Sequence, residues 1–315
     1  MAFCLVAPEM ARWNAARKGA AELRLAHNLR VMLALRCADK RLDLSAPVVM
    51  GVVNVTPDSF SDGGRFYDAG AAIEHGVRLA EEGAAILDVG GESTRPGAAD
   101  VSAEEELRRV IPVIERLRAQ TQAVVSIDTS KPEVMRAAAA AGAGLINDVR
   151  ALREPGALEA VAATDCAVCL MHMQGEPRTM QKAPSYGDVV SEVKAFLVER
   201  AHRARAAGLG EGRLAIDPGF GFGKTLEHNL QLLRQLRELE VPGLPMAVGL
   251  SRKSMVGKLT GRPEGQRVYG SVALAVIAAQ NGASIIRAHD VAATVDALRT
   301  WSAVEGIRSA GPPGR

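Results

Sequence analysis

Residues 214–224 read Leu-Ala-Ile-Asp-Pro-Gly-Phe-Gly-Phe-Gly-Lys, an apolar strand that runs into a carboxylate and then into a glycine-rich turn. Pro218 ends the strand, because proline has no N–H to donate to a sheet. Leucines at helical spacing follow from Leu226, and Thr225 is a suitable N-cap for that helix. Asp217 is therefore expected where a buried strand opens into a loop, which is where α/β proteins place their chemistry.

The end of this stretch, Gly-Phe-Gly-Lys-Thr, looks like part of a phosphate-binding P-loop. That motif requires an earlier glycine at the position that Pro218 occupies here, so the spacing excludes a P-loop. A plainer interpretation stays open from this stretch alone. Asp217 could simply cap the turn, as Asp commonly does before Pro and Gly.

The composition is that of an ordinary globular protein, with 315 residues, 48% of them hydrophobic, and 38 Lys and Arg against 36 Asp and Glu. This length supplies a core for one large domain or two small ones. The near-neutral charge gives no reason to expect a nucleic acid or a membrane surface as a partner. No apolar run reaches the roughly 18 residues that span a bilayer. Glu9, Arg12 and Asn14 interrupt the N-terminus and argue against a signal peptide.

The chain has four cysteines, Cys4, Cys37, Cys166 and Cys169, and the last two have the spacing of a redox or zinc pair. They border or lie in the apolar run 167–171, which predicts a buried strand. Residues three apart on a strand point to opposite faces, so the two thiols should diverge. No second pair with zinc spacing follows. We therefore predict reduced thiols and a cytoplasmic protein.

Residues 1–45 differ from the remainder and are interpreted as an N-terminal extension and lead-in. The run 11–36 is rich in Ala, Leu and Arg at helical spacing and contains no functional motif. It is either a helical appendage or the product of an upstream mis-start, with Met32 as a candidate true start. Detection of peptides from residues 1–31 in the native protein by mass spectrometry would rule out the mis-start.

From Pro47 onward, short apolar runs alternate with Ala- and Leu-rich segments of helical periodicity. The apolar runs predict eight strands, at 48–54, 84–89, 124–127, 144–146, 167–171, 214–217, 246–250 and 284–287. The segments after them predict helices at about 71–82, 103–118, 132–141, 156–163, 188–207, 226–240, 271–280 and 292–304.

These strands are continuous apolar runs, which is typical of parallel strands that are buried on both faces. Eight strand–helix units within residues 46–307 predict a single (β/α)₈ TIM barrel of the α/β class rather than an open doubly wound sheet. No Gly-x-Gly-x-x-Gly follows the first strand, which argues against a dinucleotide-binding fold. Residues 308–315 predict a disordered tail.

Polar residues follow the predicted strands one after another, at the ends that form the active-site rim of barrel enzymes. They are Asn54, Asp88, Asp128, Asn147 with Asp148, His172, Asp217, Ser251 to Lys253, and Arg287 with His289. Turn formation explains any one of them. It does not explain why all eight ends are polar while the strands are apolar, so we predict a small-molecule site at this rim.

The residue types narrow the chemistry of that site. Carboxylates and amides suit a heterocycle that carries N–H donors and a carbonyl, since a buried carboxylate needs such donors or a cation to stay charged. Cationic side chains on the later strands suit a phosphate group. The loops 56–66 and 92–98 could close over the site. Phe222 lies between two glycines and Phe60 shortly before Gly63 and Gly64, and glycine-rich flanks favour a position over a cleft instead of in the core.

Several motifs together resemble the dihydropteroate synthase family, in the family's order and over about residues 42–304. They are Asn-Val-Thr-Pro-Asp-Ser-Phe-Ser-Asp-Gly-Gly at 54–64, Gly-Glu-Ser-Thr-Arg-Pro-Gly at 91–97, Ser-Ile-Asp-Thr at 126–129, Ile-Asn-Asp-Val at 146–149, Met-His-Met-Gln-Gly at 171–175, the stretch 217–224, Ser-Arg-Lys-Ser at 251–254, and Arg-Ala-His-Asp at 287–290. No motif position is substituted.

The resemblance implies condensation of 6-hydroxymethyl-7,8-dihydropterin pyrophosphate with para-aminobenzoate, which gives 7,8-dihydropteroate and pyrophosphate in folate biosynthesis. It also implies Mg²⁺ as cofactor, sulfonamides as inhibitors and a homodimer as the assembly. Pterin-binding methyltransferases share the barrel and its pterin-holding Asp and Asn residues, but they have no need of the Ser-Arg-Lys-Ser or Thr-Arg-Pro motifs. A non-catalytic pterin-binding paralogue would be expected to lose Asp62, Arg95 or His289, and this chain keeps all three.

Position by position, the resemblance assigns the pterin to Asp128, Asn147, Met171, Asp217, Lys253 and Arg287. It assigns the para-aminobenzoate pocket, where sulfonamides compete, to Phe60, Thr94, Arg95, Pro96, Phe222 and Ser254. Pyrophosphate would contact Asn54, Thr94, Arg287 and His289, and the Mg²⁺ ligands would be Asn54 and Asp62. The residues implied to act directly in catalysis are Asp62, Arg95, Asp128, Lys253, Arg287 and His289.

Overall fold

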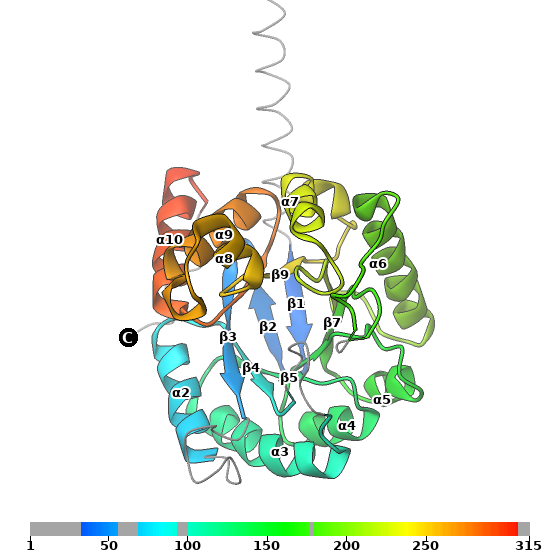
Figure 1. The fold of residues 1–315 in the computed structure, drawn as a ribbon. Coiled ribbons are helices and arrows are strands. Elements are labelled where there is room, and N and C mark those ends of the chain that lie inside the picture. The colour runs from blue at the N-terminus through cyan, green and yellow to red at the C-terminus, as the bar shows by residue number, and fades with distance from the viewer. Residues whose placement is uncertain (1–32, 56–68, 93–99, 177–178, 308–315) are drawn as a thin grey trace, which may run out of the picture.

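The computed structural model describes residues 33–55, 69–92, 100–176 and 179–307 (Figure 1). Eight parallel strands form its central sheet, in the order β8-β7-β6-β5-β4-β3-β10-β9. The strands are β3 (Val48–Asn54), β4 (Ile86–Gly90), β5 (Val124–Asp128), β6 (Leu145–Asp148), β7 (Ala167–Met171), β8 (Leu214–Asp217), β9 (Ala247–Gly249) and β10 (Ile285–Ala288). A parallel bridge between Ile216 and Met246 brings β8 beside the start of β9, so the sheet is a nearly closed barrel.

Helices surround this sheet on its outer side (Figure 1). They are α2 (Ala69–Glu81), α3 (Ala103–Gln120), α4 (Pro132–Ala140), α5 (Ala157–Ala162), α6 (Val189–Ala206), α7 (Leu226–Arg234), α8 (Ser254–Thr260), α9 (Val268–Gln280) and α10 (Val291–Val304), with short 3₁₀ segments at Leu236–Leu239 and Glu264–Gln266. The (β/α)₈ barrel predicted from the alternating pattern is confirmed. Within the described residues, no helix is long and apolar enough to cross a membrane.

Buried side chains form two layers, because alternate residues of a strand point to opposite faces. The larger layer lies between the strands and the helices and includes Val49, Leu87 and Ile127. The smaller layer fills the inside of the barrel near the strand starts, with residues such as Met50, Ile86 and Leu145. The rim at the other end of the strands is thereby left to polar side chains.

An antiparallel hairpin, β1 (Ala34–Cys37) and β2 (Lys40–Asp43), packs on this inner layer through Leu35 and Cys37. The helical spacing that we extended through Arg36 is therefore wrong for residues 33–36; residues 11–32 of that run lie outside the described residues. Leu35 and Cys37 are buried and Arg36 between them is exposed. This alternation is that of a strand, and it lets both apolar side chains pack against the barrel interior. The tertiary contact outweighs the local helix propensity.

Two helix predictions also differ from the structure. The helix expected over 226–240 ends at Arg234 and continues as a 3₁₀ turn, in which residues three apart share one face. That turn places both Leu236 and Leu239 in the core. The short helix α8 was not predicted, because its seven residues include Gly257 and carry little periodic signal.

The cysteine prediction agrees with the structure. Cys166 packs in the outer layer and Cys169 in the inner layer, so the two thiols lie on opposite faces of the sheet. Both are free, as is Cys37. Burial raises the pKa of the Cys166 thiol, and it raises that of the Cys169 thiol well above its ordinary value, which favours the unreactive neutral form of both.

Candidate active site

The centre of the rim is an ion-pair network that joins strands distant in sequence. On β10, the Nε of Arg287 donates to Asp88 Oδ2 at 2.7 Å, and its Nη2 donates to Asp128 Oδ2 at 3.0 Å. Asn147 Nδ2 donates to the same Asp88 oxygen at 3.0 Å, and Ser126 Oγ donates to Asp88 Oδ1 at 2.7 Å. Asp88 is fully buried, so these donors replace the water that a carboxylate requires.

Asp88 is the residue whose part in the site was not predicted. The sequence placed it at a strand end without a role, and the structure makes it the shared acceptor for Arg287 and Asn147. A carboxylate in the middle of an apolar strand is the signal that could have singled it out. Its effect is to hold two side chains toward the mouth of the barrel in fixed orientations.

Asp128 is the less buried carboxylate of this network, since 11% of its side chain is exposed and Asp88 is fully buried. Burial, and then the negative charge of Asp88, raise its pKa from 3.8 to about 7, while Arg287 opposes the shift. The group is therefore poised to change charge near neutral pH, as is common for functional carboxyl groups. It can stabilise positive charge only when it is ionised.

The glycine-rich stretch after β8 forms the opposite wall. Asp217 Oδ1 accepts a hydrogen bond from the backbone N–H of Gly219 at 2.7 Å, which orients the carboxylate at the strand end. Lys253 Nζ donates to the carbonyl of Phe220 and lies 4.6 Å from the centroid of the Phe222 ring. Burial lowers the pKa of Lys253 to about 8, although the charge of Asp217 raises it. The carboxylate of Asp217 and the ring of Phe222 thus belong to one loop, and the ammonium of Lys253 reaches this loop from the segment between β9 and α8.

Gly219 has no room for a side chain. Its φ is +68°, and an added Cβ would lie 1.9 Å from the carbonyl oxygen of His172. We expect Gly219→Ala to lower the free energy of unfolding by about 2–4 kcal/mol, since left-handed strain and a backbone clash act together. Urea denaturation measures this loss. Gly208→Ala is the matched control, because Gly208 has φ +97° with nothing within 4 Å; a loss no larger than that of the control would contradict the prediction.

An apolar wall lies beside these charges. Met171, at the end of β7, packs with Val149, Met173 and Met180, and the half-buried Phe222 packs against them. Methionine and aromatic side chains are well suited to the faces of a flat ring. The wall and the polar network together suit a planar molecule with hydrogen-bonding edges.

The cationic side of the rim lies on β9, β10 and the adjacent end of β3. His289 donates through its backbone N–H to Ser251 Oγ at 3.1 Å, and its Nδ1 lies 3.0 Å from the same oxygen. Asn54 is exposed at the end of β3, which pairs with β10, and Ser254 is exposed at the start of α8. This arrangement suits an anionic group that extends outward from the ring.

Two strand-end residues do not face the mouth. Asp148 accepts hydrogen bonds from the backbone N–H groups of Arg150 and Leu152, at 2.8 and 2.7 Å, and so caps the turn before α5. His172 is buried against Lys224 and Phe196. The prediction that every strand end delivers its polar group to the site is therefore wrong for these two residues. Phe60, Asp62, Thr94, Arg95, Pro96 and most of the two predicted lid loops lie outside the described residues.

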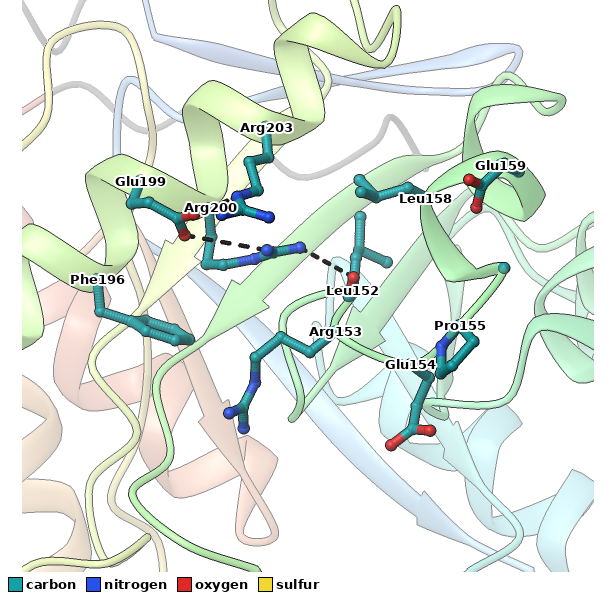
Figure 2. A pocket seen from close by; sticks show the side chains of 11 residues that line it. Leu152, Arg153, Glu154, Pro155, Leu158, Glu159, Phe196, Glu199, Arg200 and Arg203 are labelled. Carbon is teal, nitrogen blue, oxygen red and sulfur yellow. Dashed lines mark hydrogen bonds and ion pairs between the residues drawn. The ribbon is translucent and has the colours of Figure 1, made fainter.

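A cavity of about 480 Å³ lies away from this rim, between α6 and the turn that leads into α5 (Figure 2). It contains three arginines and three glutamates, so its charge is balanced. Arg200 is occupied by the carbonyls of Ala151 and Leu152, at 2.8 and 2.9 Å. Phe196 separates the cavity from His172, with the ring centroids 4.9 Å apart. The network of Asp88, Asp128, Asn147 and Arg287 lies at the rim and does not line this cavity.

Comparison with known proteins agrees with this geometry. A family described as pterin binding enzyme matches residues 50–289. The dihydropteroate synthase of Escherichia coli strain K12 is 56% identical over 271 residues, which cover 85% of this chain and 96% of that protein. A Xanthomonas albilineans dihydropteroate synthase structure with 4-aminobenzoic acid is 61% identical, covers 87% of this chain and 99% of that one, and has a TM-score of 0.82. The structure of Yersinia pestis dihydropteroate synthase in a sulfonamide drug complex is 53% identical and has a TM-score of 0.83. The match covers 87% of this chain and 100% of that one.

Proposed function

This chain belongs to the dihydropteroate synthase family of pterin-binding enzymes, and we propose that the rim described above holds both substrates of the family's reaction. The enzyme is a transferase that condenses 6-hydroxymethyl-7,8-dihydropterin pyrophosphate with para-aminobenzoate and releases pyrophosphate, in folate biosynthesis. The observation that carries the assignment of the rim is the network of Asp88, Asp128, Asn147 and Arg287, which orients carboxylate and amide groups toward one point.

In this proposal, the pterin edge is read by Asp128, Asn147 and Asp217. Carboxylates accept from the ring N–H groups, and the amide of Asn147 offers a carbonyl oxygen while its Nδ2 is held by Asp88. Lys253 and Arg287 supply donors for the ring carbonyl and nitrogens. Met171 contributes one apolar face, since it packs in the wall beside Phe222.

Para-aminobenzoate would bind next to the pterin, toward Phe222 and Ser254, with Phe60, Thr94, Arg95 and Pro96 completing its pocket. Two observations support this position. Phe222 is half-buried in the apolar wall, and Ser254 is exposed at the start of α8, immediately after Lys253. A sulfonamide would compete at the same place, because the related Yersinia pestis enzyme has been solved with such a drug.

Pyrophosphate would lie toward Asn54, Arg287 and His289, with Thr94 as a further contact. For Mg²⁺ we propose Asn54 and Asp62 as ligands. The exposed amide of Asn54 is a hard oxygen donor, which fits this ion, and Mg²⁺ commonly takes its other ligands from substrate phosphates and water. When bound, the metal would offset negative charge on the leaving group.

The chemistry follows from the positions of the charges. The C–O bond to pyrophosphate breaks first, and the cationic side chains Arg287 and His289 offset the charge that develops on the leaving group. The pterin methylene becomes a cation delocalised over the ring, which Asp128 stabilises in its ionised form. The neutral amine of para-aminobenzoate then attacks and afterwards loses a proton. Closure of the predicted loops 56–66 and 92–98, which contain Asp62 and Arg95, would exclude water that could trap the cation.

The activity should depend on the ionisation of Asp128. Because its pKa is raised to about 7, we expect kcat/KM to fall as the pH drops through this value. On stability the sign is opposite: the native state keeps a proton that the unfolded chain releases above 3.8, so this group makes the free energy of unfolding decrease up to about pH 7. A profile of kcat/KM against pH measures the first effect. If kcat/KM did not depend on pH, or if the same fall near pH 7 remained in Asp128→Asn, the prediction for Asp128 would be contradicted.

The first test of the function is an assay of dihydropteroate formation from both substrates, with and without Mg²⁺. We expect turnover that requires both substrates and the metal, and calorimetry should show tighter pyrophosphate binding when Mg²⁺ is added. Tight pterin binding without turnover would instead indicate a non-catalytic paralogue. Neither turnover nor binding would contradict the assignment of the rim altogether.

We also propose a homodimer that associates through α8 and α9. Helix α9 buries Leu274 and Ala278 on the barrel, yet it also exposes Tyr269 and Ile277, and Leu259 is exposed on the neighbouring α8. Exposed apolar side chains gathered on adjacent helices are typical of protein interfaces. Sedimentation of the wild type should give twice the mass of one chain, and Ile277→Asp should give the mass of a single chain. A monomeric wild type would contradict the proposal.

A cytoplasmic location is likewise proposed, because the buried thiols are free.

A further inference from the structure

Lys224, at the end of the glycine-rich stretch, has the sequence position of a P-loop lysine but a different environment. Its side chain is turned inward and is 3% exposed. The Nζ donates to the carbonyls of Gly219 at 2.9 Å and Phe222 at 3.0 Å, and it lies 3.0 Å from His172 Nδ1. The ammonium therefore occupies the inside of the β8–α7 loop instead of facing a phosphate.

When Lys224 carries its proton, His172 is the acceptor in this contact, because an ammonium group has donors only. The ring is then neutral, with its proton on Nε2. Burial, and then the charge of Lys224, lower the pKa of His172 to about 3, which is consistent with a neutral ring at every physiological pH. The ring is fixed from its other side by Phe196, at 4.9 Å and an interplanar angle of 88°. His172 thus ties Lys224 to β7.

The loop around Lys224 has little regular backbone bonding of its own. The N–H of Phe222 donates to Gly219 O at 3.1 Å, and the N–H of Gly221 is bonded by the side chain of Asn229 at 2.8 Å. Carbonyls that point inward would otherwise be buried without enough donors, which is costly. The lysine supplies these donors. Its own burial is costly too, and burial lowers its pKa to about 7 although Asp217 opposes the shift.

The same loop positions three groups of the rim. The N–H of Gly219 orients Asp217, the carbonyl of Phe220 accepts from Lys253, and the ring of Phe222 lies under that ammonium. Each contact is made within a few residues of a carbonyl held by Lys224. A shift of the loop would therefore move a carboxylate, a cation and an aromatic face together.

We propose that Lys224 and His172 are a positioning pair for pterin binding: the ammonium of Lys224, held by His172, fixes the β8–α7 loop so that Asp217, Phe222 and Lys253 keep their geometry. Neither residue touches the substrate in this proposal. It rests on the proposed function of the rim, and the wild-type turnover assay tests that function separately.

Lys224→Met separates positioning from simple stabilisation. Methionine has nearly the same volume but leaves the carbonyls of Gly219 and Phe222 without the donors of Lys224, so we expect Tm to fall by several degrees while the protein still folds at the assay temperature. We expect the Kd of the pterin pyrophosphate, measured by calorimetry, to rise about 30-fold, and kcat/KM to fall at least as much. Lys194→Met, on the exposed face of α6, is the control and should leave both constants unchanged.

Variants of His172 test the pairing itself. His172→Asn offers an amide oxygen near the position of Nδ1 and should retain binding within about 3-fold, whereas His172→Phe should weaken it about 10-fold. The double variant Lys224→Met/His172→Phe should bind no worse than Lys224→Met alone.

Three results would overturn the proposal. Wild-type Kd and kcat/KM in Lys224→Met, with only Tm lowered, would mean a purely structural role. Additive losses in the double variant would mean that the two residues act independently. If Lys224→Met fails to fold, equal binding by His172→Asn and His172→Phe would contradict the pair, and the expected difference between them would support it.

Discussion

Arg287→Met is expected to lower the free energy of unfolding by about 3–5 kcal/mol, the cost of leaving a buried charge without its partner. Arg287 bonds to Asp88, which is fully buried, and to Asp128, whose side chain is 11% exposed. Asp88 would keep only the neutral donors of Ser126 and Asn147. Turnover should fall to background, because the same arginine is proposed to contact the pterin and the pyrophosphate.

The loss can be separated from a general packing defect. Protonation relieves an uncompensated carboxylate, so the destabilisation measured by urea denaturation should be smaller at about pH 5 than at about pH 8. The double variant Asp88→Asn/Arg287→Met should recover much of the stability and none of the activity. Arg234→Met is the control: its pair with Glu227 is exposed, at 64% and 69%, and should matter by less than about 1 kcal/mol. A loss no larger than the control's would contradict the buried-pair interpretation.

Asp217→Asn is expected to weaken pterin binding by about 3 kcal/mol, which is roughly 100-fold in Kd. The amide can still accept from the N–H of Gly219, so the loop should keep its conformation. The side chain in Asp217→Asn has no negative charge, however, and it would direct an NH₂ donor at the N–H donors of the pterin, which weakens binding. Calorimetry with the pterin pyrophosphate measures this loss.

The matched control is Asp165→Asn, an exposed aspartate that precedes β7 at the other end of the barrel. It should bind the pterin like the wild type. Para-aminobenzoate should be affected less than the pterin in Asp217→Asn, because its proposed pocket lies toward Phe222 and Ser254. Unchanged pterin affinity in Asp217→Asn would remove this carboxylate from the binding site and leave the capping role that the sequence left open.

These two predictions concern different properties of the same rim. Arg287 is held between carboxylates from β4 and β5, so its loss affects folding as well as binding. Asp217 is held by the backbone of its own loop, so its replacement should affect binding more than folding. Stability measurements on both variants would show whether the site is built from these two separable parts.

Those features of the fold that depend on local pattern could be predicted from the amino-acid sequence. Continuous apolar runs predicted parallel strands, polar residues at their ends predicted the rim, and the position of Pro218 excluded a P-loop. Strand alternation alone predicted that Cys166 and Cys169 diverge. Side-chain direction on a strand and turn chemistry depend on neighbours in the chain, so a sequence contains them directly.

Which polar groups contact one another could not be predicted without the folded barrel. Arg287 and Asp88 are 199 residues apart, and their ion pair depends on the order of strands around the barrel. Barrel packing likewise made a strand of Ala34–Cys37, which has helical spacing, and turned His172 and Lys224 toward each other. Such contacts depend on closure of the sheet, which places distant strand ends at one rim, and no local pattern records which side chains will face one another there.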